Sequence, residues 1–200
     1  MKINLTQNKN FKIFKIISKV AQENNQTVYI VGGYVRDLLM QRKAPTDIDF
    51  VTEQSGIELA KAVGKELGDL KVSVFKTYGT AMIKYKDLDL EFVGARKESY
   101  SEDSRKPAVE TGTLEDDQKR RDFTVNALAI SLNAENFGEL IDPFNGREDM
   151  QNKILRTPLE PAQTYSDDPL RMMRAIRFAS VLHFEIEKNS LEAIKQEAER

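Results

Sequence analysis

The spacing of apolar residues along the first third of the chain predicts alternating helices and strands. Apolar residues recur at helical spacing near the N-terminus, which predicts an amphipathic helix over 10–24. The run over 27–33 predicts a strand that ends in a glycine pair, and 34–42 predicts a short helix. A second strand is expected over 46–52, and a further helix over 55–67.

The middle of the chain contains two segments in which apolar and polar residues alternate. They cover 71–85 and 87–93, and a period of two is typical of half-buried strands. In the second segment the apolar positions are Leu88, Leu90 and Phe92, and the positions between and before them are Asp87, Asp89 and Glu91. We therefore expect this strand to show one face to the core and an acidic face to the other side.

The rest of the chain predicts a long loop and then mostly helix. No period is sustained over 94–119, and a loop of that length is usually functional or mobile. A helix is expected over 120–132, a short strand over 138–141, a turn over 142–149 and a long helix over 168–182. The apolar side chains of the long helix are expected in the core, namely Met172, Met173, Ile176 and Phe178.

A final helix is expected over 190–200. It reaches Arg200 without a glycine or other cap, from which we expect a longer helical region to continue beyond this residue. The 200 residues suffice for one sizeable domain, or for one domain and the start of another.

Composition and charge limit the possible partners. The chain is 40% hydrophobic and 31% charged, as in ordinary globular proteins. Its formal net charge is -2, so no overall positive field holds a polyanion. Any nucleic acid must be held by a local patch, or by a part of the protein that lies outside this sequence.

Two further features favour a cytoplasmic protein without a membrane partner. The chain has no cysteine, so it forms no disulfide and no thiolate metal site. Lysines interrupt the apolar residues of the N-terminus, unlike in a signal peptide, and no apolar run is long enough to span a bilayer.

Asp47 and Asp49 are the first candidates for chemistry. Residues two apart on a strand point to the same face, so both carboxylates converge there. Such oxygen ligands suit Mg²⁺, which completes its coordination with water and phosphates. Glu91 adds a third, catalytic carboxylate if its strand is a neighbour. The alternative is a solvated strand edge or a helix cap.

Gly32 and Gly33 lie between a strand and a helix, where glycines let the backbone approach an anion closely. Arg36 in the first helical turn adds a charged donor. The alternative is an ordinary tight turn. A phosphate site followed fourteen residues later by a carboxylate pair suggests a nucleoside triphosphate bound with Mg²⁺.

Four motifs in order resemble those of the class II tRNA nucleotidyltransferase and bacterial poly(A) polymerase family. They are GGYVRDLLM with TDIDF, RRDFTVNALA, GREDMQNKILRTP and DDPLRMMRAIRFAS. The resemblance implies an α+β fold: a head of the DNA polymerase β type, with a mixed sheet flanked by helices, and then a helical neck. We place the catalytic head at 1–142 and the start of the neck at 143–200. In this family, body and tail domains that hold tRNA follow the neck.

The resemblance also assigns roles. It implies triphosphate contacts for Gly32, Gly33 and Arg36, and catalytic metals on Asp47 and Asp49. It implies that the sugar and phosphates are contacted by Arg121, Asp122 and Asn126. The alternative is that Arg120, Arg121 and Asp122 cap and solvate a helix.

Asp168 and Arg171 stand three apart at the start of a predicted helix, and so on one face. An acceptor beside a donor matches the base edges of cytosine and adenine, whereas guanine and uracil have the opposite polarity. The alternative is a helical ion pair. The family's base-reading motif usually begins Glu-Asp and begins Asp-Asp here, one residue before the pair. Arg174 and Arg177 face phosphate or solvent.

The resemblance implies a template-independent nucleotidyltransferase that uses Mg²⁺. It would add CMP and AMP from CTP and ATP to the 3′ end of tRNA and release pyrophosphate. Poly(A) addition, CC addition and A addition are alternatives that share all four motifs. A nucleotide-binding module without catalysis is a further alternative, although such a module has no need of a metal-binding carboxylate pair.

Overall fold

The computed structural model describes residues 1–43, 45–101 and 104–198, and it contains a seven-stranded mixed sheet flanked by helices. The strand order is β3-β4-β5-β2-β1-β8-β9, in which β2 and β5 run parallel and all other neighbours run antiparallel. In that order the strands are Val72–Phe75, Thr80–Tyr85, Leu88–Gly94, Asp47–Thr52, Tyr29–Val31, Ala129–Ser131 and Leu140–Ile141.

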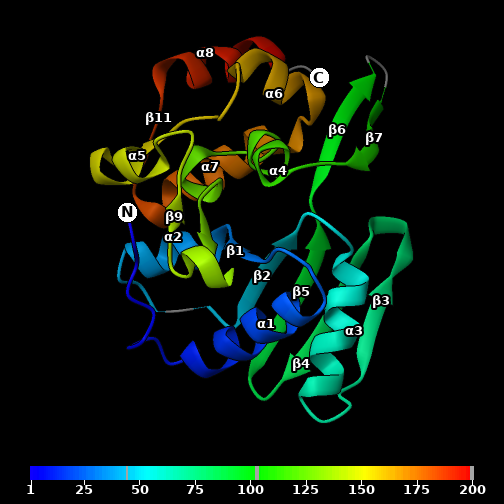
Figure 1. The fold of residues 1–200 in the computed structure, drawn as a ribbon. Helices are drawn as coiled ribbons and strands as arrows, with labels where there is room; N and C mark the ends of the chain where they lie inside the picture. Colours follow the sequence, from blue (N-terminus) through cyan, green and yellow to red (C-terminus); the bar gives the residue numbers. More distant parts are fainter. Residues whose placement is uncertain (44, 102–103, 199–200) are drawn as a thin grey trace.

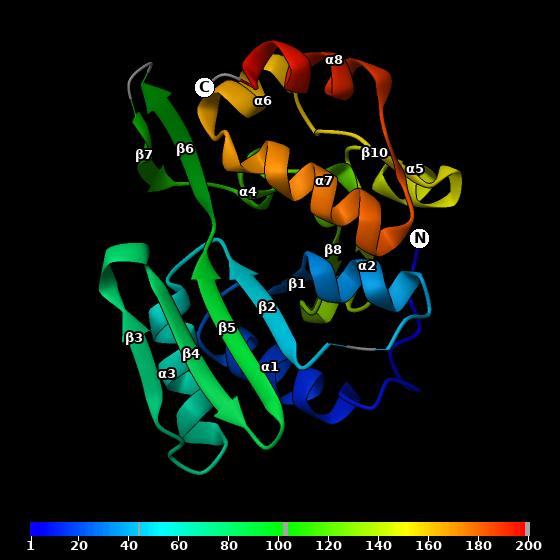
Figure 2. The same ribbon diagram turned by 180° about the vertical axis from the view of Figure 1, so that it is seen from behind.

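Helices α1 and α3 lie against one face of the sheet, and α5 to α8 gather beyond the ends of its strands (Figures 1 and 2). The helices α1 to α8 are Phe11–Glu23, Gly33–Leu39, Gly56–Glu66, Leu114–Lys119, Gly146–Asn152, Pro161–Asp167, Leu170–Leu182 and Lys188–Glu197. The short 3₁₀ helices η1 to η3 are Lys76–Tyr78, Thr124–Asn126 and Ala134–Asn136. No helix in the described ranges is both long and apolar enough to cross a membrane.

The elements with a clear apolar face form as predicted. Helix α1 buries Phe14 and Ile17 against the sheet, and its ends differ by one residue from those expected. Helix α3 begins where the Ser55 hydroxyl accepts a hydrogen bond from the Glu58 amide at 3.2 Å. In β5 the predicted core positions are buried, namely Leu88, Leu90 and Phe92.

The first alternating segment, 71–85, is two strands rather than one. It folds as the antiparallel pair β3 and β4, joined by η1. Gly79 ends η1 with a φ of +63°, a left-handed conformation that glycine adopts without strain. The alternation therefore continues through a turn that its period does not reveal.

The prediction of a loop over 94–119 is wrong. An antiparallel hairpin forms there from β6 (Arg96–Ser101) and β7 (Ser104–Thr111), and it continues from β5 beside the helices (Figure 1). Helix α4 follows, with a capping box at Thr113 and Asp116. The buried face of α4 is partly polar, with Asp117 and Gln118, so no apolar period marks it.

The helix predicted over 120–132 is also wrong, because η2 and strand β8 occupy this range. All residues of β8 are buried, because one of its faces packs into the larger apolar core through Ile130 and the other into a separate cluster through Ala129. A continuous apolar run fits an inner strand as well as a buried helix. The position in the sheet decides between them here.

The C-terminal third contains more elements than predicted. Strand β9 is confirmed, and the turn after it is short because α5 begins at Gly146. Helix α6 precedes the predicted long helix, and α7 begins at Leu170. Strands β10 (Ile154–Leu155) and β11 (Glu185–Ile186) pair in parallel. The last predicted helix is α8, and residues 199–200 lie outside the described residues.

The two largest apolar clusters of the described residues form separate cores. The larger one joins the sheet to α1 and α3. The second joins Phe123 and Val125 to Leu155, Ala175 and Leu182. Residues from both sides of the proposed boundary at 142 thus share one core, and the division into head and neck stays a prediction.

Candidate nucleotide-binding site

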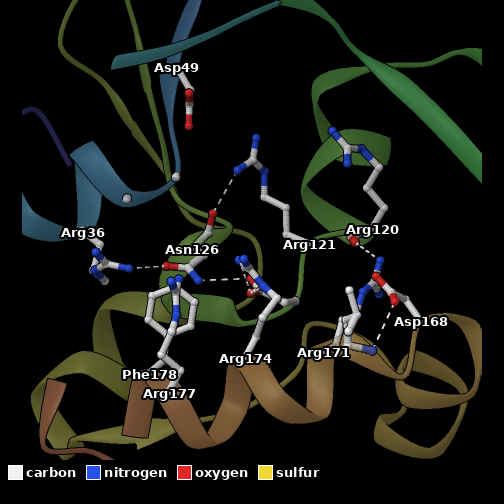
Figure 3. A pocket seen from close by; sticks show the side chains of 14 residues that line it. Arg36, Asp49, Arg120, Arg121, Asn126, Asp168, Arg171, Arg174, Arg177 and Phe178 are labelled. Atoms are coloured by element: carbon white, nitrogen blue, oxygen red, sulfur yellow. Dashed lines mark hydrogen bonds and ion pairs between the residues drawn. The ribbon is translucent and has the colours of Figure 1, made fainter. Parts of the chain in front are cut away.

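A cavity of about 620 Å³ lies between the ends of β1 and β2, the segment after α4, and helix α7 (Figure 3). It is lined by Gly32, Gly33, Arg36, Asp49, Arg120, Arg121, Asp122, Asn126, Asp168, Leu170, Arg171, Arg174, Arg177 and Phe178. Six of these residues are arginines and three are aspartates. The cavity therefore attracts anions, although the chain as a whole carries a net charge of -2.

Gly32 lets the backbone pass close to the arginines. Its φ is +71°, and a Cβ at this position would lie 2.9 Å from Nη1 of Arg121 and 3.7 Å from a carboxylate oxygen of Asp49. The Gly32 amide donates to the Leu128 carbonyl at 3.1 Å, which connects the turn to the segment before β8. Glycine at this position thus leaves room for charged side chains from two other elements.

Arg36 is held by side chains on both sides. Its side chain is buried, its Nη1 donates to Oδ1 of Asn126 at 2.7 Å, and its Nε pairs with Asp37 at 2.9 Å. The first of these bonds spans 90 residues of sequence and connects α2 to η2. The family resemblance assigns Arg36 and Asn126 to the same nucleotide site. The structure shows that the two side chains are in direct contact.

Asn126 connects Arg36 to helix α7 through Asp122 and Arg174. Its Nδ2 donates to Oδ1 of Asp122 at 3.0 Å, and Nε of Arg174 donates to Oδ2 of Asp122 at 2.7 Å (Figure 3). Because Oδ1 of Asn126 accepts from Arg36, both ends of its amide are satisfied. A continuous hydrogen-bonded chain thus crosses the cavity floor from α2 to α7.

Asp117, which the sequence analysis did not single out, supports two arginines of the cavity from outside its lining. It is fully buried and accepts hydrogen bonds from Nε of Arg120 at 3.0 Å and from Nη2 of Arg121 at 2.8 Å. Burial alone raises the pKa of Asp117, but the Arg121 and Arg120 guanidiniums outweigh it and hold the pKa below its ordinary value. Its spacing of three and four residues from Arg120 and Arg121 is the sequence signal that could have indicated these ion pairs.

Asp49 brings a carboxylate to the edge of the cavity, with its side chain near that of Arg121 (Figure 3). Burial raises the pKa of Asp49; Arg121 lowers it, and the Asp47 and Asp117 carboxylates raise it again, so that it lies above its ordinary value. Asp47 is exposed, and it acts on Asp49 across the two-residue spacing that the sequence predicted.

Glu91 lies on β5 directly opposite Asp49 in the parallel pair. Burial, and then the Asp49 and Asp47 carboxylates, raise the pKa of Glu91. The strands are thus neighbours, as the third-carboxylate hypothesis requires. In the described part of the chain, however, no three acidic, histidine or cysteine side chains gather closely enough to hold a metal ion, and Glu91 as a third ligand stays a prediction.

Asp168 and Arg171 both line the cavity, but they do not share a helix face. Asp168 is extended, with φ -142° and ψ 97°, because Pro169 follows it and disfavours helical geometry. Its Oδ1 accepts from the Leu170 amide at 3.2 Å, and Nη2 of Arg171 donates to the Arg120 carbonyl at 2.8 Å. The acceptor and the donor thus reach the cavity from a bend and from a helix.

The apolar residues of α7 are divided between three environments. Met172 is buried as predicted, whereas Met173 and Ile176 are 64% and 54% exposed. Phe178 lines the cavity instead of lying only in the core. The cavity lining also includes Leu170, which the sequence analysis did not single out, and Arg120, which it named only as a helix cap.

The sequence of this chain matches a known protein family. Residues 28–156, more than half of the sequence, match the poly(A) polymerase head domain. The chain belongs to the poly(A) polymerase head domain family. The resemblance drawn from the four motifs is confirmed, and the sheet and its flanking helices are the fold of this head domain.

Relatives of this head domain include an A-adding tRNA nucleotidyltransferase of Aquifex aeolicus, 44% identical over 84% of the chain and 20% of the relative. A CCA-adding enzyme of Lactobacillus helveticus is 40% identical over 86% of the chain and 41% of the relative. A solved tRNA nucleotidyltransferase with a primer tRNA and an incoming ATP analogue matches 92% of the chain and 50% of its own, with 39% identity and a TM-score of 0.81.

The chain described here thus spans between a fifth and a half of the length of these proteins. The matched range includes the glycine pair, Asp49 and the segment from Arg120 to Asn126. Asp168 and the arginines of α7 lie beyond it, and they line the same cavity as the matched residues.

Proposed function

We propose that the cavity binds a nucleoside triphosphate and that the protein transfers CMP and AMP from CTP and ATP to the 3′ end of tRNA in the cytoplasm, releasing pyrophosphate. The observation that carries this proposal is a cavity with six arginines and, at its edge, a carboxylate of the pair Asp47 and Asp49. The relatives are named as tRNA nucleotidyltransferases and CCA-adding enzymes, which supports the same reaction.

Asp47 and Asp49 fit a divalent cation such as Mg²⁺. Both are oxygen ligands, and the raised pKa of Asp49 reflects burial and carboxylate repulsion that a cation relieves. Two carboxylates without a complete cage suit Mg²⁺, which takes its other ligands from water and phosphates. When bound, the ion would activate the attacking hydroxyl and stabilise the leaving pyrophosphate.

The chain's own residues would position the nucleotide. Arg36 and Arg121 supply charged donors for phosphate oxygens, and the Asn126 amide fixes Arg36 in place. Asp122, beside Asn126, would accept from a sugar hydroxyl, and Gly32 and Gly33 leave room for the phosphate chain. Arg174 and Arg177 would add positive charge on the α7 side.

Asp168 and Arg171 would read the base. An acceptor and a donor side by side pair with the amine and the ring nitrogen of cytosine and adenine, without a nucleic-acid template. This role requires only that both groups reach the cavity, so the bend at Asp168 leaves it intact. Arg171→Ala should reduce the preference for CTP and ATP over GTP and UTP by about tenfold, which is about 1.4 kcal/mol.

The test is extension of a tRNA that ends before CCA, with each nucleotide supplied in turn and together. We expect C to be added first and A last, and no incorporation of G or U. Addition of A alone to unrelated RNA would contradict the tRNA reaction and indicate poly(A) addition. ATP binding without any transfer would indicate a binding module.

A narrower reaction is a second candidate. The Aquifex aeolicus relative is named an A-adding enzyme, as is a Geobacter sulfurreducens relative, 40% identical over 90% of the chain. If A addition is the whole activity, the protein will extend only a tRNA that already ends in CC. The same extension assay separates this outcome from complete CCA addition.

A further inference from the structure

The aromatic ring of Phe178 lies among three guanidinium groups of the cavity (Figure 3). The guanidinium carbons of Arg36, Arg174 and Arg177 lie 5.3, 5.2 and 4.9 Å from the ring centroid. All three distances fall within the range of about 6 Å over which an aromatic face attracts a cation. Arg174 and Arg177 share α7 with Phe178, whereas Arg36 comes from α2, so the ring gathers cations from two elements.

Three guanidiniums around one ring repel one another, and water screens this repulsion only in part, because Arg174 and Arg177 are exposed whereas Arg36 is buried. Carboxylates offset a further part of it. Arg36 pairs with Asp37 at 2.9 Å, and Arg174 pairs with Asp122 at 2.6 Å. For Arg177, the described residues provide no carboxylate within 4.0 Å. Three cations and two anions leave this cluster with one net positive charge.

The ring also packs against the second apolar core. Phe178 packs edge to face against Phe123, with centroids 5.9 Å apart and planes at 79°. Phe123 is fully buried and belongs to the second apolar core. The ring therefore has a contact in the core in addition to its contacts with the arginines.

We propose that Phe178 is a positioning residue that holds Arg36, Arg174 and Arg177 together as the site for the phosphate chain of the nucleotide. An aromatic face attracts cations without cancelling their charge, so the arginines remain available to an anion. A carboxylate at this position would neutralise the site, and an aliphatic side chain would leave the repulsion in place. This inference rests on the proposed function, because it requires a nucleotide in the cavity.

The test compares ATP and adenosine binding by calorimetry in the presence of Mg²⁺. Phe178→Leu keeps an apolar side chain and removes the aromatic face, and we expect it to weaken ATP binding about five- to tenfold. Adenosine binding should stay within about twofold, because adenosine has no phosphate, and Phe178→Tyr should restore ATP binding. In nucleotide transfer, KM for ATP should rise with little change in kcat.

Phe184→Leu is the matched control. Phe184 is a buried aromatic residue of the same core, and its ring has no guanidinium over it among the described residues. Both this variant and Phe178→Leu should unfold at a lower temperature than the wild type, but Phe184→Leu should bind ATP like the wild-type protein. Equal loss of ATP affinity in both variants would show a general packing effect and overturn the inference.

Two other results would overturn it. If Phe178→Leu binds ATP as tightly as the wild type, the ring does not organise the arginines, and the proposed function stands. If ATP and adenosine binding weaken equally, the ring contacts the base instead. Failure of the wild-type protein to bind ATP would refute the proposed function itself, and the inference with it.

Discussion

Asp117 pairs with two arginines that line the cavity, Arg120 and Arg121. It is fully buried and holds Arg120 and Arg121, whose side chains are mostly buried as well. Asp117→Asn leaves both guanidiniums without their counter-charge, so we expect a loss of about 3 kcal/mol in the free energy of unfolding at pH 7. Denaturant unfolding measures this loss. Glu115→Gln, on the exposed side of the same helix, should change stability by less than about 0.5 kcal/mol.

The difference between wild type and Asp117→Asn should depend on pH. The folded-state pKa of Asp117 lies below its ordinary value of 3.8. The stability that the charged form contributes is therefore complete above that ordinary value and is lost as the pH falls through the lower folded-state pKa. A difference that stays constant on acidification would contradict the assignment of an ionised Asp117.

Asp49 should behave in the opposite way. Its folded-state pKa is raised above 3.8, so folding disfavours its charged form at neutral pH. Asp49→Asn removes this penalty, and we expect the variant to unfold at a higher temperature than the wild type at pH 7.5. The two proteins should converge as the pH falls below 3.8. A lower unfolding temperature at pH 7.5 would show that pairing with Arg121 outweighs burial.

Helix α5 and the 3₁₀ helix η2 are packed with almost no space between them. A Cβ on Gly146 would lie 2.2 Å from the Thr124 carbonyl oxygen, and Oγ1 of Thr124 donates to Asp149 of α5 at 2.7 Å. Gly146→Ala must move the two elements apart, and we expect a cost of about 1–3 kcal/mol. Because η2 also carries Asn126, ATP binding should weaken in the same variant.

Asn152→Ala is the control for this prediction, since Asn152 is exposed at the end of α5. It should leave both stability and ATP binding close to those of the wild type. Unchanged stability in Gly146→Ala would mean that α5 and η2 separate at little cost.

Elements that bury one face were predictable from sequence, and elements whose neighbours decide their form were not. Helix α1 and strand β5 have apolar residues at a clear period, and both form where expected. Strand β8 has no period because both of its faces are covered, Ile130 in the larger core and Ala129 in a separate apolar cluster, and it was mistaken for a helix. The hairpin β6 and β7 lies outside the main sheet, and its sequence lacks the apolar alternation of a half-buried strand.

The molecule as a whole builds one cavity from segments that are far apart in sequence. The order of the motifs was enough to select residues that line it, such as Arg36, Asn126 and Arg171. It did not reveal the contacts between them, because hydrogen bonds such as that of Arg36 with Asn126 depend on how the segments pack. Asp117 and Phe178 were missed for the same reason, since each acts through arginines that it holds.

The proposed reaction requires that nucleotidyl transfer takes place in the cavity and uses Asp49. The most direct measurement is pyrophosphate release with ATP, CTP and a tRNA that ends before CCA, in the presence of Mg²⁺. We expect the wild-type protein and Asp87→Asn, a change at an exposed acid in the turn before β5, to release pyrophosphate at similar rates. Asp49→Asn should be at least about a hundredfold slower while still folded. Equal rates of pyrophosphate release for Asp49→Asn and the wild type would contradict the proposed role of Asp49 in nucleotidyl transfer.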